Sequence, residues 1–145
     1  MGISGIGHGR PPHAYTLYCP PLDTSPRIAR DFVGSVLTRL RMDACVDAAA
    51  LCTSELATNA LVHAPGLGSL LWLSVEPKLV RITVYDGTLD EPAIRAECPE
   101  REGGRGLRLV AELADAWGTS PGAPLGVGGA RGKGVWFELG VACLA

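Results

Sequence analysis

The sequence contains no apolar run that approaches the ~20 residues needed to cross a bilayer. Its first ten residues, MGISGIGHGR, lack the apolar core of a signal peptide, and Ile6 breaks the pattern for N-myristoylation. These absences argue against membrane and secreted classes. We therefore expect a cytoplasmic protein that has no membrane partner.

An excess of positive charge is also lacking. The net charge is −2, which gives no electrostatic case for direct nucleic-acid binding. The five cysteines are odd in number and form no C-x-x-C pair or cluster with metal-ligand spacing. This usage fits a reducing compartment. The Rossmann and Walker nucleotide-binding patterns are absent as well.

The composition that remains is that of a folded domain. Hydrophobic residues make up 47% and charged residues 19% of the 145 residues, which suits one domain with a substantial core. Residues 1–13 are rich in glycine and proline, and we expect a flexible N-terminal tail there. Residues 14–145 are expected to form the domain.

The stretch Leu51–Pro65, LCTSELATNALVHAP, predicts most of a long and mostly buried helix, which starts near Asp43 as its N-cap. Glu55 and Asn59 lie four residues apart on one face, and His63 continues the row. A buried carboxylate needs partners or a ligand, because an unpaired buried charge is very costly. From the helix alone, a solvated polar face is an equally good interpretation.

The other segments predict a simple layered fold. Residues 14–19 are typical of an edge strand, and a helix is expected to begin with Ser25 as N-cap and Pro26 at its first position. Its apolar residues repeat every fourth position at Ile28, Phe32, Val36 and Leu40, with Ala29, Val33 and Leu37 beside them. Residues 70–75 and 79–86 then predict a β-hairpin.

Asp86 ends the second hairpin strand. Alternation places it on the apolar face with Val80, Ile82 and Val84, and Gly87 follows directly. An aspartate that only initiates a turn before glycine is the alternative interpretation.

The rest of the chain is glycine-rich. Thr88–Gly103 predicts a mobile loop, and the glycines at 103–106 open a helix over 107–114, where free N–H groups suit phosphate oxygens. A strand near Trp117, a loop over 119–134 and a strand over 135–141 complete the chain. The order β-α-α-β-β-loop-α-β-β predicts an α+β fold with helices on one face of a mixed, mostly antiparallel sheet.

Four motifs occur in one order: S-E-L-x-T-N-A-x-x-H-A, a strand ending in Asp-Gly, G-G-R-G-L-x-L-V and G-K-x-V-W-F-E-L. In this order and spacing they resemble the GHKL ATPase superfamily, and within it the single-domain anti-sigma-factor serine kinases of bacterial partner-switching systems. The resemblance runs from about Tyr15 to Leu139. It implies a two-layer α/β sandwich of the Bergerat type, in which residues 14–145 form a histidine-kinase-like ATP-binding domain.

The resemblance also implies roles for individual residues. Asn59 would coordinate Mg²⁺ bridging the phosphates of ATP, Glu55 would be the catalytic carboxylate, and Asp86 would accept the adenine amino hydrogen. His63 matches a family position near the nucleotide. The remaining residues that the resemblance places around ATP are Gly87, Thr88, Gly104, Arg105, Gly106, Leu107 and Gly134.

The function implied is an ATP-dependent protein serine kinase that phosphorylates a STAS-type anti-anti-sigma factor and also sequesters a sigma factor. Relatives commonly form homodimers. The alternative is a nucleotide-gated binding module without phosphate transfer, which is favoured by Thr88 where members usually carry glycine and Gly134 where many carry threonine. A detached sensor-kinase domain is disfavoured, because no long dimerising helix carries a phosphoacceptor histidine.

Overall fold

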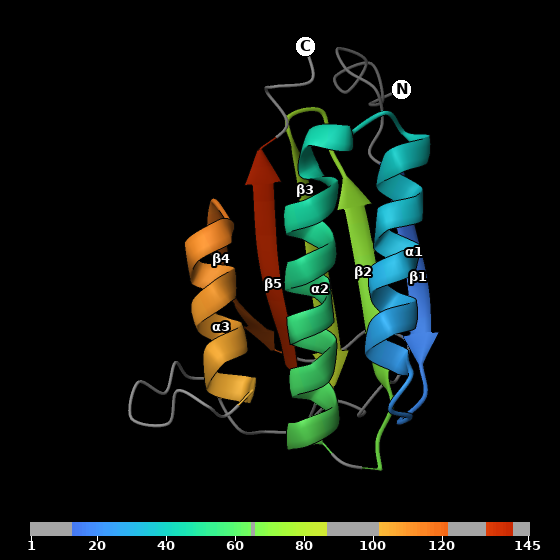
Figure 1. The fold of residues 1–145 in the computed structure, drawn as a ribbon, viewed down its shortest axis with the longest axis vertical. Coiled ribbons are helices and arrows are strands. Elements are labelled where there is room, and N and C mark those ends of the chain that lie inside the picture. The colour runs from blue at the N-terminus through green and yellow to red at the C-terminus, as the bar shows by residue number, and fades with distance from the viewer. Residues whose placement is uncertain (1–12, 65, 87–101, 122–132, 141–145) are drawn as a thin grey trace, which may run out of the picture.

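The computed structural model of the protein describes residues 13–64, 66–86, 102–121 and 133–140, and these form eight elements (Figure 1). The helices are α1 (Ser25–Arg39), α2 (Asp43–His63) and α3 (Glu102–Leu113). The strands are β1 (His13–Cys19), β2 (Ser69–Val75), β3 (Leu79–Asp86), β4 (Ala116–Pro121) and β5 (Lys133–Gly140). The order of elements is the one predicted from the sequence.

The strands form one five-stranded sheet in the order β1-β2-β3-β5-β4. Each of the four neighbouring pairs is antiparallel, so the expected mixed sheet is wrong for the part of the chain that the structure describes. The reason lies in β5, which runs opposite to β3 on one side and opposite to β4 on the other. The predicted edge strand β1 and the β2–β3 hairpin are confirmed.

All three helices lie on one face of the sheet, so the fold is a two-layer α+β arrangement (Figure 1). The core lies between the layers and includes Val80, Ile82 and Val84 on β3, each at most 3% exposed. Along α1, the fully buried residues are Ala29, Val33 and Leu37. The expected amphipathic helix is confirmed, since Phe32, Val36 and Leu40 are partly buried and pack against this core. Ile28 is the exception, because its side chain is 52% exposed.

The two expected helix N-caps are wrong. Ser25 and Asp43 are the first helical residues, and the preceding Thr24 and Met42 make no side-chain cap hydrogen bond. The Ser25 hydroxyl instead donates to the carbonyl oxygen of Pro20 at 2.6 Å, which fastens the turn after β1 to the start of α1. Asp43 lies in the first turn of α2, where the helix dipole favours a carboxylate.

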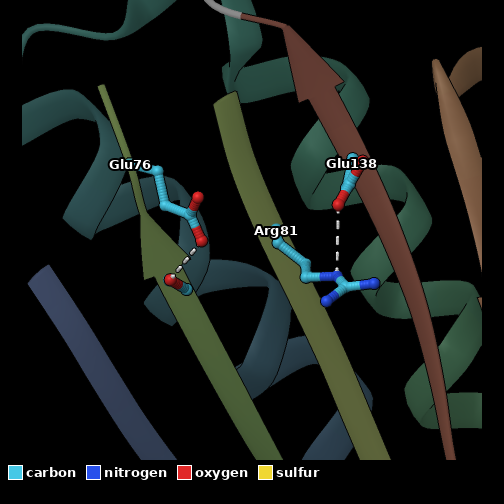
Figure 2. A network of polar contacts seen from close by, with 4 residues as sticks. Glu76, Arg81 and Glu138 are labelled. Carbon is cyan, nitrogen blue, oxygen red and sulfur yellow. Dashed lines mark hydrogen bonds and ion pairs between the residues drawn. The ribbon is translucent and has the colours of Figure 1, made fainter. Parts of the chain in front are cut away.

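The other face of the sheet carries polar and aromatic side chains and lies away from the helices. Figure 2 shows Arg81 on β3 beside Glu138 on β5, with 3.3 Å between Nε and Oε2. The Arg81 guanidinium also lies 4.0 Å from the ring centre of Trp136. Among the helices of the described residues, none combines the length and the apolar character that a membrane span requires.

Candidate functional site

Four segments that are far apart in the sequence meet at one end of the two layers. They are the C-terminal half of α2, the end of β3, the start of β5 and the first turns of α3 (Figure 1). The antiparallel pairing of β3 with β5 brings the end of one strand beside the start of the other. All four sequence motifs therefore contribute residues to this end.

Glu55 on α2 and Gly106 on α3 lie in direct contact. A Cβ atom added to Gly106 would lie 2.7 Å from Glu55 Oε1 and 3.2 Å from Glu55 Cβ. Only a residue without a side chain allows the α3 backbone to lie this close to the carboxylate. The glycines were expected to precede a helix starting at residue 107, and this was wrong, since α3 begins at Glu102 and contains them. Packing of α3 against α2 outweighs the low helix propensity of glycine.

Asn59 lies one helical turn after Glu55 and is 9% exposed. Its Oδ1 atom is buried and has no hydrogen-bond partner among the described residues. A buried acceptor without a partner costs about 1–3 kcal/mol, so a native protein keeps one for a reason. A ligand that supplies the missing partner is such a reason. His63, one turn further on, is exposed.

Asp86 lies on the core face as predicted and is 6% exposed. Its Oδ1 lies 3.6 Å from Nζ of Lys133, the first residue of β5, whose side chain is 12% exposed. Lys133 was not among the site residues predicted from the sequence. Alternation along β5 could have found it, because Val135 faces the core and Lys133 is two residues before it.

The other residues that were expected around the nucleotide lie beyond the described part of the chain, on α3, or on the other face of the sheet. Gly87 and Thr88 lie outside the described residues. Gly104 and Arg105 lie in the first turns of α3, and Leu107 is buried at 2% exposure. The structure does not bring Gly134 together with the others: it pairs with Tyr85, and an added Cβ would lie 2.8 Å from the Tyr85 ring on the face away from the helices.

Comparisons with known proteins add no family, since no family model matches the sequence and no curated protein matches it significantly. Among the described residues there is no group of three or more histidine, cysteine, aspartate or glutamate side chains that could hold a metal ion. The site is thus defined by its own chemistry: two carboxylates, a buried amide oxygen and a mostly buried ammonium group.

Cys52 lies one turn before Glu55 on α2 and is fully buried. Burial raises the pKa of the Cys52 thiol to about 11, and the negative charge of Glu55 adds to the rise. Because this pKa is higher in the folded state, we expect stability to fall as the pH rises from about 9 to 11, by up to about 1.4 kcal/mol per pH unit. Urea unfolding of the wild type and of Cys52→Ala at several pH values measures this.

Since lysine and tyrosine also titrate in this range, the quantity to compare is the difference between the two pH profiles. The wild type should lose about 2 kcal/mol more than Cys52→Ala between pH 8 and pH 11. Parallel profiles would contradict the assignment of this pH dependence to the Cys52 thiol.

Proposed function

We propose that the protein binds Mg²⁺ and ATP at the end of the sandwich where Glu55, Asn59 and Asp86 lie, and acts as a protein serine kinase. Its substrate in this proposal is a STAS-type anti-anti-sigma factor, and it also sequesters a sigma factor. The observation that carries the proposal is the buried Asn59 Oδ1 atom without a partner, one helical turn from the carboxylate of Glu55. The resemblance described above supplies the substrate and partner classes.

The donor set fits a magnesium nucleotide. Mg²⁺ prefers oxygen ligands and keeps several waters and phosphate oxygens, so one protein amide oxygen is enough to anchor it. Asn59 would hold the ion through Oδ1, and the bound ion would neutralise charge on the phosphates. The first turns of α3 would offer backbone N–H groups to phosphate oxygens, where glycine permits close approach.

Glu55 and Asp86 have separate tasks in this mechanism. An ionised carboxylate only accepts hydrogen bonds, so Asp86 suits the amino group of adenine. Glu55 would orient the serine hydroxyl of the partner protein and accept its proton as the oxygen attacks the γ-phosphate, while the bond from the γ-phosphorus to the bridging oxygen breaks and ADP leaves. Contact with Gly106 restricts the Glu55 side chain, which lowers the entropy lost in holding the hydroxyl.

One observation favours a second function, a nucleotide-gated binding module that transfers no phosphate. Gly134 stands where many members of the resembled family carry threonine, so a hydroxyl that commonly supports the adenine contact is missing. Such a module would bind the sigma factor or the STAS partner and use the nucleotide only as a switch. The homodimer implied by the resemblance stays a prediction under both functions.

Calorimetric titration tests the common basis of both functions. We expect the wild type to bind ATP in the presence of Mg²⁺ and to bind it more weakly in EDTA. Asn59→Ala should reduce the affinity for Mg-ATP about 10- to 100-fold, the size expected for one lost polar contact to a charged group. It should not lower stability by more than about 1 kcal/mol, because it removes a buried oxygen that has no partner in the described protein. Absence of binding to the wild type at millimolar ATP would remove both functions.

A further inference from the structure

The ammonium group of Lys133 is an unusual feature of the site. Its side chain is 12% exposed, and Asp86 is its one ion-pair partner among the described residues. The 3.6 Å between Nζ and Asp86 Oδ1 is longer than the 2.7–2.9 Å typical of a charge-assisted hydrogen bond. An ammonium carries three N–H donors, and burying them without acceptors is costly. At this distance Asp86 balances the charge of Lys133 without accepting a hydrogen bond from it, so the N–H donors of Lys133 are available to a ligand.

Strand register explains why the donor lies there. Asp86 and Lys133 are directly paired at the end of β3 and the start of β5, and both side chains lie on the face that the helices cover. An acceptor and a donor thus stand side by side at the edge of the nucleotide site. The adenine ring presents the complementary pair on one edge: the 6-amino group donates, and the adjacent ring nitrogen N1 accepts.

We propose that Lys133 is a base-recognising residue that donates a hydrogen bond to N1 of adenine while Asp86 accepts one from the 6-amino group. This inference rests on the proposed function, because it needs adenine beside Asp86. Two adjacent contacts of opposite polarity fix the orientation of the base more tightly than one contact does. Lys133 supplies a donor on the face that the helices cover. Gly134 has no side chain, and a Cβ atom added there would point to the opposite face, toward Tyr85.

Paired substitutions in protein and ligand test the contact. The ligands are ATP and 1-deaza-ATP, in which a C–H group replaces N1. The wild type should bind 1-deaza-ATP about tenfold more weakly than ATP, the size expected for one hydrogen bond to a charged group. Lys133→Met should bind the two ligands equally. Lys133→Arg, which keeps the donors and the charge, should restore part of the preference for ATP.

Arg81→Met is the matched control, because Arg81 is also a cation at the β3–β5 junction with a carboxylate partner, but on the opposite face (Figure 2). It should keep the wild-type ratio of the two affinities. Each ratio compares one variant with itself, so a partly unfolded sample does not change it.

The outcomes separate the two levels of the proposal. A wild type that binds ATP and 1-deaza-ATP equally overturns the role of Lys133 and leaves the proposed function standing. The same holds for a Lys133→Met variant that keeps the wild-type preference, since Lys133 would then be only a counter-ion for Asp86. A wild type that binds neither ligand overturns the proposed function, and the inference with it.

Discussion

Replacing Glu55 with glutamine is expected to lower the rate of phosphate transfer to serine by about 10²- to 10⁴-fold, the usual contribution of a general base. Glutamine has nearly the same size and can keep the close contact with Gly106, but it cannot accept the proton of the attacking hydroxyl. The affinity for Mg-ATP should change little, because the proposed metal contact comes from Asn59. The loss should therefore appear in the transfer rate and not in binding.

Single-turnover transfer from labelled ATP to a STAS-domain protein measures this rate, with calorimetry on the same samples. Ser54→Ala is a matched control on α2. Ser54 is the residue before Glu55 but lines a different hollow, formed by α1 and α2 with Arg27, Arg30 and Thr58 among its walls. We expect wild-type transfer from this control. A Glu55→Gln variant that transfers at the wild-type rate would contradict the role of Glu55 as the base.

If the wild type binds ATP and transfers phosphate to no STAS-domain protein that binds it, the kinase function fails and the nucleotide-gated module remains. The measurement therefore separates the two proposed functions as well as testing one residue. It requires a partner that binds, so a binding assay with that partner precedes the transfer assay.

Features that depend on neighbours in the sequence could be predicted. Asp86 faces the core because strand side chains alternate, and this follows from residues 79–86 alone. The alignment of Glu55 with Asn59 follows from the helical repeat, and the β2–β3 hairpin from two apolar runs joined by a short turn. The order of elements followed from the same local patterns, and it is confirmed.

Features that depend on tertiary contacts were missed. Periodicity gave the apolar side of α1, but the exposure of Ile28 depends on how the helix packs against α2 and β1. The contact of Gly106 with Glu55 depends on how α3 packs against α2. Alternation along β5 places Lys133 on the core face, but its position beside Asp86 depends on the register of β5 against β3, which joins residues 47 positions apart in the sequence. The residue types of the site could thus be predicted from short stretches of sequence, whereas the contacts between them depend on how distant segments pack.

Replacing Asp86 with asparagine is expected to weaken the binding of ATP by about 100-fold or more. The amide presents an N–H group where the adenine amino group needs an acceptor, and one lost charge-assisted hydrogen bond accounts for about 10- to 100-fold. Lys133 also loses its carboxylate partner at 3.6 Å, which leaves a mostly buried ammonium without its counter-charge. The lost counter-charge also lowers the stability of the folded protein, because breaking a buried ion pair by removing one partner is strongly destabilising.

A second ligand distinguishes the loss of adenine recognition from a loss of folded protein. Purine riboside triphosphate lacks the 6-amino group, so the wild type should bind it more weakly than ATP, and Asp86→Asn should not distinguish the two. Thermal unfolding of the variant, with and without Lys133→Met, shows how much of the change is structural: the second substitution removes the unpaired ammonium and should recover stability while the discrimination stays lost. If Asp86→Asn prefers ATP as strongly as the wild type does, Asp86 does not read the amino group, and the base lies elsewhere.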